Sequence, residues 1–187
     1  MPPGWMHPVP AFAFLVANFA GCAAGSAQVT RELLDERTGT TLTRPAKPVE
    51  LLNAGTTGAA GDPFAYLGPF QTNRMGAYAL YLWVATPVAD ESHLGVSSIV
   101  CEEKTTTLVP ITGSLAELGL SAAPYAPPAP WSRIRYYSLS YEDLQCLQHA
   151  SRAVLTLNAG TPGEEHFQAT KGALSSLVSF EAERPSP

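Results

Sequence analysis

The hydrophobic and polar residues of this chain alternate mainly with the period of β-strands. The clearest example is residues 76–85, where Tyr78, Leu80, Leu82 and Val84 share one face and apolar residues also fill the other. Because successive strand side chains point to opposite faces, a strand that is apolar on both is covered on both sides. We therefore expect a central strand at residues 76–85.

Turn-forming residues separate further strand-like segments. The sequence DERTGTTLT predicts a tight hairpin around Thr38 and Gly39, because glycine accepts the positive φ of such turns. Its strands would be residues 29–36 and 40–43. Further strands are expected at residues 49–53, 94–102, 105–111, 132–139, 153–158 and 165–170, loops at 54–63 and 121–130, and a single helical turn at 115–120.

Two helices are expected in the C-terminal part. Ser140 and Asp143 have the spacing of a capping box, in which each side chain bonds a free backbone N–H at the helix start. Apolar residues then recur at helical spacing over residues 141–150 and again over residues 173–183. The whole pattern predicts an α+β fold, a mainly antiparallel β-sandwich or meander with two short C-terminal helices.

Composition and charge narrow the function classes. The chain has 187 residues, of which 45% are hydrophobic and 14% charged, enough for one domain with a real core. Its formal charge is −5, and its basic residues form no run. Nucleic-acid binding needs a surplus of Lys and Arg on one face, so we expect no nucleic-acid partner.

The N-terminal segment has the features of an export signal. Residues 9–21 form a nearly unbroken apolar stretch without a charged residue. The stretch is too short to span a bilayer comfortably but as long as the hydrophobic region of a signal peptide. The sequence Phe19-Ala20-Gly21-Cys22 resembles the lipobox of bacterial lipoproteins. This resemblance implies cleavage before Cys22, whose thiol would carry the lipid. We expect a signal peptide at 1–21, a lipidated tether at 22–28 and one β-rich domain at 29–183.

The resemblance also implies a location. The YLGPF, NRMG and YLW sequences and the C-terminal strand-helix-strand pattern look like uncharacterised envelope lipoproteins of proteobacteria. Ala23 follows the cysteine, which in that family favours the outer membrane, with the domain facing the periplasm. One alternative is cleavage after Ala27, which would give a soluble periplasmic or secreted protein. Another is a buried apolar helix of a cytoplasmic protein, although prolines at positions 2, 3, 8 and 10 make a poor helix start.

The cysteines fit an oxidising compartment. If Cys22 carries a lipid, Cys101 and Cys146 remain as an even pair. A disulfide between them would stabilise the domain by roughly 3–4 kcal/mol in the chain-entropy model. The competing interpretation is two buried free thiols.

No catalytic, metal or cofactor motif emerges from the sequence. The G-x-S-x-G motif is absent, and His93, His149 and His166 have no zinc-type spacing. His93 lies beside Asp90 and Glu91, where a metal or a hydrolase site would be conceivable. We expect no catalytic residue, no metal and no cofactor. A periplasmic hydrolase using His93 or His166 is the alternative.

Two segments are candidates for an interaction surface. One is the aromatic run containing Tyr66, Phe70 and Arg74, in which Arg74 either forms a salt bridge or points into a binding cleft. The other is Trp131 after the proline-rich loop, where proline and aromatic residues can form a recognition surface. We expect a non-enzymatic, lipid-anchored module that binds another envelope protein, or an accessory subunit of a secretion or envelope-assembly machine.

Overall fold

The computed structural model describes residues 29–54, 64–86 and 95–184. These residues build one ten-stranded antiparallel sheet with two short helices, which confirms the predicted α+β class. The strands are β1 Thr30–Asp35, β2 Thr40–Pro45, β3 Val49–Asn53, β4 Phe64–Arg74, β5 Ala77–Thr86, β6 Val96–Cys101, β7 Lys104–Leu108, β8 Arg133–Ser138, β9 Arg152–Ala159 and β10 Glu165–Thr170. The helices are α1 Tyr141–His149 and α2 Lys171–Leu174, which continues into the 3₁₀ helix η1 Ser175–Leu177.

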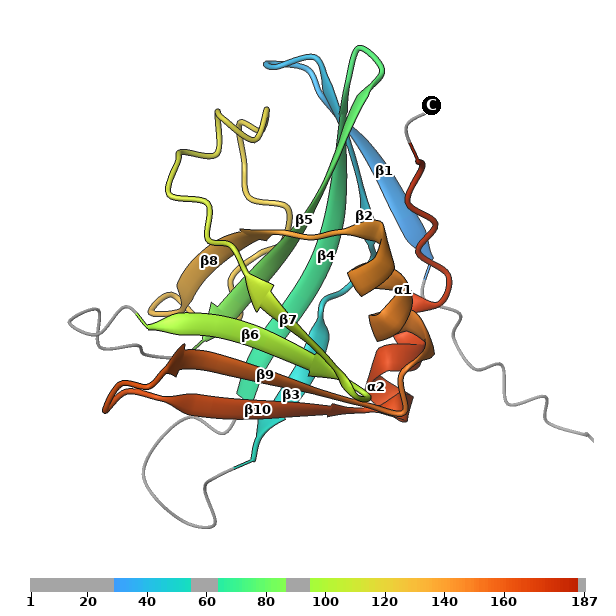
Figure 1. Ribbon diagram of the computed structural model, residues 1–187. Helices are drawn as coiled ribbons and strands as arrows, with labels where there is room; N and C mark the ends of the chain where they lie inside the picture. The colour runs from blue at the N-terminus through green and yellow to red at the C-terminus, as the bar shows by residue number, and fades with distance from the viewer. Residues whose placement is uncertain (1–28, 55–63, 87–94, 185–187) are drawn as a thin grey trace, which may run out of the picture.

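Strand β4 organises the sheet. One of its edges pairs first with β3 and farther along with β2, and its other edge pairs with β5. From β3 the sheet runs through β10, β9 and β6 to β7, and from β5 it runs to β8. A bridge between Pro110 and Tyr137 joins the segment after β7 to β8. The sheet thus curls until its ends meet, and β6, β9 and β10 lie across the direction of β4 and β5 (Figure 1).

Two hydrophobic clusters stabilise this curled sheet. The inner cluster fills the concave side, where α1 and the C-terminal segment cover one end with Leu144, Leu147, Leu177 and Phe180. The outer cluster lies on the opposite face of β4, β5 and β8, beneath the long loop that precedes β8; it contains Leu42, Phe70, Trp83, Ala85, Leu118, Leu120 and Tyr125. Strand β5 contributes to both clusters.

The predicted central strand is therefore confirmed. Leu82 and Trp83 are neighbours on opposite faces of β5, and both are fully buried. The predicted hairpin around Gly39 is also confirmed, with φ of 66° at Gly39 and Leu33 opposite Leu42. The strands expected at 49–53, 132–139, 153–158 and 165–170 are β3, β8, β9 and β10.

Strand β4 was not expected from the sequence. Gly68 and Pro69 disfavour a strand interior, because proline lacks an N–H for the ladder. The structure places Pro69 where β4 has no neighbour on one edge, since β3 pairs with residues 64–67 and β2 with residues 71–73. The Tyr125 hydroxyl donates a hydrogen bond to the Pro69 carbonyl at 2.6 Å. The unpaired edge of β4 between β3 and β2 thus tolerates a proline, and the Pro69 carbonyl has a hydrogen-bond partner.

The expected helix at 173–183 is wrong in extent, because helical structure ends at Leu177. The hydroxyls of Ser175 and Ser176 donate to the carbonyls of Gly172 and Ala173 at 2.7 and 2.8 Å. Such local bonds compete with continuation of a helix. The Gln148 amide then donates to the carbonyls of Leu177 and Phe180. The chain leaves the helix and runs back toward β4.

The capping box at α1 is confirmed in one half only. The Ser140 hydroxyl accepts from the Asp143 backbone N–H at 3.1 Å, as predicted. The Asp143 carboxylate instead accepts from the hydroxyls of Ser140 and Thr106 and from Lys104 Nζ. Asp143 therefore joins the β7 side of the sheet to the helix start.

Candidate functional site

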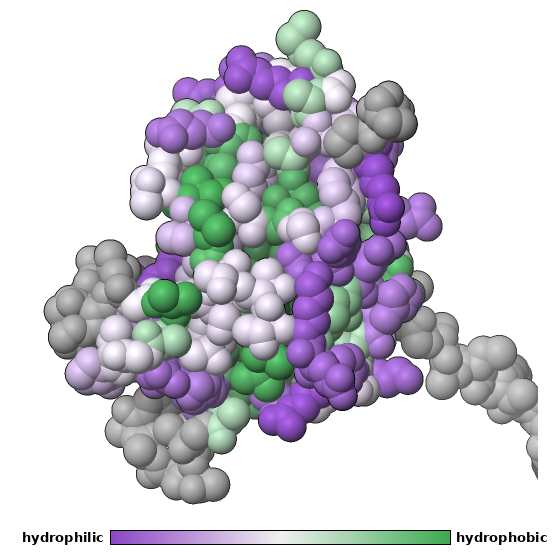
Figure 2. All heavy atoms as spheres, in the orientation of Figure 1, coloured by the Kyte–Doolittle hydropathy of each residue, from purple (hydrophilic) through white to green (hydrophobic). Residues whose placement is uncertain are grey.

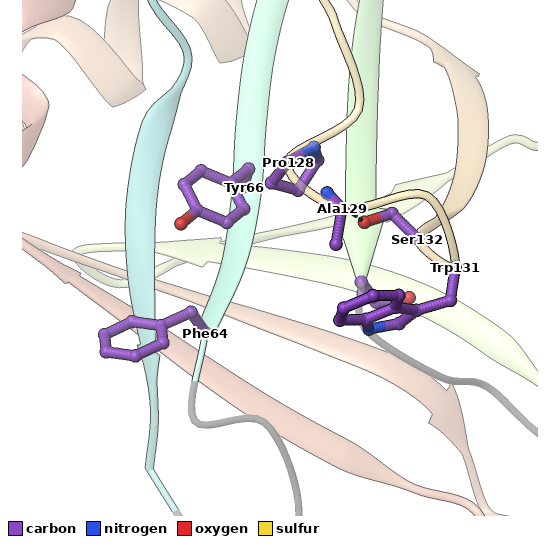
Figure 3. A pocket seen from close by; sticks show the side chains of 7 residues that line it. Phe64, Tyr66, Pro128, Ala129, Trp131 and Ser132 are labelled. Atoms are coloured by element: carbon purple, nitrogen blue, oxygen red, sulfur yellow. Dashed lines mark hydrogen bonds between the residues drawn. The ribbon is translucent and has the colours of Figure 1, made fainter.

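A small cleft of about 170 Å³ lies at the start of β4. Two aromatic residues on one face of β4, Phe64 and Tyr66, form one part of its lining. The loop before β8 forms the other part with Trp131 and Pro128, and Figure 3 shows these side chains around the opening. The remaining lining residues are Thr86, Ala129 and Ser132.

The loop wall of this cleft is anchored through Tyr125. Its ring is 3% exposed and packs 5.2 Å from the Trp83 ring, and the Arg44 guanidinium lies 4.7 Å from the ring centroid. Burial raises the pKa of the Tyr125 hydroxyl, which stays protonated and donates to Pro69. The loop is thus fixed to β4 at Tyr125, a few residues before the loop residues that line the cleft.

Gly68 makes this anchoring possible. A Cβ atom at position 68 would lie 2.4 Å from Cε2 of Tyr125, far inside van der Waals contact. Gly68 lies on the same face of β4 as Phe64 and Tyr66, because residues two apart on a strand share a face. The absence of a side chain at this position lets the Tyr125 ring lie directly on the strand.

Trp131 projects from a tight turn at the rim of the cleft. The Ser132 N–H donates to the Ala129 carbonyl at 3.0 Å, and the Ala129 N–H donates to the Ser132 hydroxyl at 3.1 Å. The Trp131 side chain is 62% exposed. A fixed turn that holds a large aromatic residue in solvent, beside a cleft, is an arrangement suited to contact with another molecule.

The four residues predicted for an interaction surface fall into three environments. Tyr66 and Trp131 line the same cleft. Phe70 lies on the same face of β4 as Tyr66 but is fully buried, and its ring lies 5.3 Å from the ring of Tyr81. Phe70 is therefore a core residue and not part of an interaction surface. Arg74 is exposed at the other end of β4. No carboxylate of the described residues lies within salt-bridge distance of Arg74, and Arg74 is not among the residues that line the cleft.

The cleft also contains residues that the sequence did not indicate. Phe64 alternates with Tyr66 on β4, and this same-face aromatic pair would have been visible had β4 been recognised as a strand. Thr86, Ala129 and Ser132 carry no such pattern, because their position depends on how the loop packs.

Cys101 and Cys146 form a disulfide with a Cα–Cα distance of 6.0 Å. It joins the end of β6 to α1 across a sequence separation of 45 residues. Of the two interpretations of these cysteines, the bonded pair is confirmed. Neither sulfur is a free thiol in this structure, and the bond ties the helix to the curled sheet.

The histidines give no enclosed reactive site in the described residues. His166 Nε2 lies 2.9 Å from Glu164 Oε1, and its Nδ1 lies 3.1 Å from the Thr156 hydroxyl. This arrangement resembles a hydroxyl-histidine-acid series, but it lies on the exposed surface of the β9–β10 hairpin and lines none of the described pockets. His149 is exposed at the end of α1. The cluster of Asp90, Glu91 and His93 lies outside the described residues.

The residues of the described ranges contain no group of three His, Cys, Asp or Glu side chains that could hold a metal ion. None of the helices in these ranges is long and apolar enough to cross a membrane. Cys22 and the lipobox-like sequence lie outside the described residues.

Comparisons with known proteins give no relative from which a site could be transferred. No family model matches the chain, and no curated protein or solved structure is significantly similar to it. The candidate site is therefore the aromatic cleft with Tyr66 and Trp131, together with the disulfide as the clearest chemical feature of the domain.

Proposed function

We propose that this chain is a non-enzymatic module of the bacterial envelope, anchored by lipid at Cys22 and facing the periplasm, that binds another envelope protein. The observation that carries the binding proposal is the exposed Trp131 beside the cleft that it shares with Tyr66. Tryptophan and tyrosine are over-represented among the residues that dominate protein–protein binding energy.

The size of the cleft favours a protein partner. At about 170 Å³ it is smaller than the 300–1,000 Å³ typical of small-molecule pockets. It has room for one apolar side chain of a partner, with Trp131 and Pro128 as its rim. Proline and a hydrogen-bonded turn hold the rim in place, which reduces the entropy lost on binding.

The disulfide supports the envelope location. Structural disulfides persist in oxidising compartments such as the periplasm and are rare in the cytosol. The Cys101–Cys146 bond therefore agrees with export through a signal peptide. It supports the soluble exported alternative equally, so lipid attachment at Cys22 needs its own test.

Intact mass of the membrane fraction tests the anchor. The native protein is expected to begin at Cys22 and to carry acyl mass, whereas the Cys22→Ala variant is expected to leave the membrane fraction. An unmodified chain beginning at Gln28 would instead support the soluble exported alternative. An uncleaved chain in the cytosol would contradict the proposal.

Photo-cross-linking in intact cells tests the binding surface. A photoreactive amino acid at Trp131 is expected to capture one predominant protein, which Trp131→Ala and Tyr66→Ala should fail to bind in a purified assay. The matched control is the same probe at Met75, which is 98% exposed at the β4–β5 turn. Equal capture by the probes at positions 131 and 75 would contradict the proposed binding surface. If the captured protein belongs to a secretion or assembly machine, the accessory-subunit alternative is supported.

A further inference from the structure

A second and larger groove, of about 660 Å³, lies where the two ends of the curled sheet meet. Two backbone hydrogen bonds join the ends, from Ile111 N–H to the Tyr136 carbonyl at 2.8 Å and from Ser138 N–H to the Val109 carbonyl at 3.1 Å. Among the described residues the bridge between the ends is confined to Pro110 and Tyr137. The groove therefore opens beside a short seam rather than beside a continuous strand pair.

The walls of this groove are mainly apolar. They come from the start of β6, the end of β7 with the segment after it, and β8; the apolar side chains are Val96, Leu108, Val109, Pro110, Ile111, Ile134, Tyr136 and Tyr137. Val96 and Val109 are 58% and 62% exposed, which is unusual for valine. Figure 2 shows that apolar side chains reach this face of the molecule in several separate patches between polar ones. The volume falls within the range of pockets that take small molecules.

One charged residue lines the groove. Arg135 on β8 is half-buried, and its Nη1 donates to Asn158 Oδ1 at 3.1 Å. That bond orients the guanidinium while leaving its other N–H groups available, because a guanidinium carries five donors. Hydroxyl groups lie nearby, since the Tyr137 hydroxyl donates to the Ser97 hydroxyl at 3.1 Å and both residues line the groove.

The carboxylate of Glu165 on β10 lies near enough to Arg135 for the two charges to interact. Burial raises the pKa of Glu165, and the nearby Arg135 acts in the opposite direction. One carboxylate oxygen of Glu165 is buried without a hydrogen-bond partner among the described residues. No ion pair within 4.0 Å joins Glu165 to Arg135 in this part of the chain, so the guanidinium is not fully neutralised.

We propose that this groove binds an amphiphilic anion, a molecule with a carboxylate or phosphate head group on an apolar chain. Arg135 would hold the head group, and the apolar walls would cover the chain. A cation among apolar walls complements such a molecule in both charge and hydrophobicity, and planar guanidinium groups bind carboxylate and phosphate with two parallel bonds. This inference is independent of the protein partner proposed for the Trp131 cleft, and each can fail without the other.

The test uses three ligands with the same chain and different head groups. Dodecanoate, dodecanol and dodecyltrimethylammonium are titrated below their critical micelle concentrations into the purified full chain without detergent, and amide NMR shifts at residues 95–97 and 134–137 report binding. Dodecanoate is expected to bind about tenfold or more tightly than dodecanol, because a charge-assisted hydrogen bond is lost in the alcohol. Equal affinities for all three ligands would overturn the proposal.

Matched variants assign the effect to Arg135. Arg135→Gln is expected to bind dodecanoate no more tightly than dodecanol, while Arg135→Lys keeps part of the preference. Arg74→Gln removes an exposed arginine at the far end of β4 and is expected to change nothing. Glu165→Gln removes the nearby carboxylate and is expected to tighten dodecanoate binding severalfold, which tests the charge relationship even if Arg135→Gln folds poorly. The proposal would be overturned if Arg135→Gln kept the wild-type preference for dodecanoate over dodecanol, or if Glu165→Gln bound dodecanoate more weakly.

A second arm distinguishes the source of the anion. The chain is incubated with vesicles of phosphatidylglycerol and phosphatidylcholine, separated from them and analysed by mass spectrometry for bound lipid. Recovery of phosphatidylglycerol would identify membrane lipid as the ligand. Recovery of no phospholipid, together with tight dodecanoate binding, would identify a free fatty acid. If the chain neither retained phospholipid nor bound dodecanoate, the proposal would be overturned.

Discussion

The side-chain amide of Gln71 and the backbone of Glu183 form a closed pair of hydrogen bonds. Gln71 Nε2 donates to the Glu183 carbonyl at 2.6 Å, and the Glu183 N–H donates to Gln71 Oε1 at 2.9 Å. Gln71 is 2% exposed and also donates to the Tyr141 hydroxyl. One side chain on β4 thus holds both the C-terminal segment and the start of α1.

Gln71→Leu should therefore loosen the C-terminal segment as well as destabilise the domain. The substitution removes the Gln71 partner of the Glu183 N–H and leaves the Glu183 carbonyl with the Tyr141 hydroxyl as a donor. Loss of such partly buried bonds costs about 1–3 kcal/mol. Urea unfolding measures the loss, and hydrogen exchange of the Glu183 amide should accelerate. The control is Gln145→Leu on the exposed face of α1. Equal effects of the two substitutions would contradict the role of Gln71.

Gly68→Ala should destabilise the domain although it adds only a methyl group. The new Cβ would lie 2.4 Å from the Tyr125 ring, which cannot retreat because its hydroxyl is bonded to Pro69 and Trp83 packs against it. Overpacking of this kind costs about 1–3 kcal/mol. Thermal unfolding measures the loss, and Trp131 fluorescence should change as the loop shifts.

The comparison variant is Gly163→Ala, where a Cβ would meet its nearest atoms at 3.9 and 4.0 Å. It should unfold at the wild-type temperature. A tolerated Gly68→Ala would show that the Tyr125 anchor of the loop is not rigid.

Asp143 should make stability depend on pH in the acidic range. Burial acts to raise the pKa of Asp143, but hydrogen bonds from Lys104, Ser140 and Thr106 outweigh it and hold the pKa below the ordinary 3.8. Because the pKa is lower in the folded than in the unfolded state, these bonds contribute stability above pH 4 and lose it as pH falls through the folded pKa.

Asp143→Asn should cost about 1–3 kcal/mol at pH 7 and flatten the acid limb of the stability curve. Urea unfolding between pH 2 and pH 7 measures both effects. Glu142→Gln is the control, because the Glu142 side chain is 86% exposed and lies 3.9 Å from Lys104. A wild-type acid limb retained in Asp143→Asn would assign the pH dependence to other carboxylates.

Removal of the disulfide should have the largest effect on stability. The loop between Cys101 and Cys146, with a separation of 45 residues, predicts a loss of about 4 kcal/mol in the chain-entropy model. Reduction should add about 2 Da to the intact mass and lower the urea midpoint, and Cys101→Ser/Cys146→Ser should match the reduced protein. Identical midpoints for the oxidised and reduced protein would contradict a stabilising role.

Local chemistry explains which parts of the fold were predictable. The β1–β2 hairpin depends on Gly39 and its neighbours, and α1 starts at Ser140, so short sequence windows contain the deciding residues. Strand β4 was missed because Pro69 is tolerated only through the gap between β2 and β3 and the hydroxyl of Tyr125. No sequence window contains those partners.

The candidate site was predictable to the same limited degree. Tyr66 and Trp131 were expected on interaction surfaces as separate features, and their meeting in one cleft depends on how the loop before β8 folds over β4. The same loop buries Phe70, which an aromatic run alone cannot distinguish from an exposed residue. Arg135 lies in the strand expected at residues 132–139, and its place in a groove follows only from the seam of the sheet.

The pairing of β3 with β10 has a consequence for biosynthesis. Asn53 and Leu52 of β3 pair with Phe167 and Gln168 of β10, and Gln71 of β4 donates a hydrogen bond to the Glu183 carbonyl. A ribosome must therefore make nearly the whole chain before the native sheet can be completed, and such long-range pairing forms slowly. Throughout its synthesis the emerging chain lacks the contacts that would lock it into a finished domain, which keeps it suited to being threaded through a narrow pore.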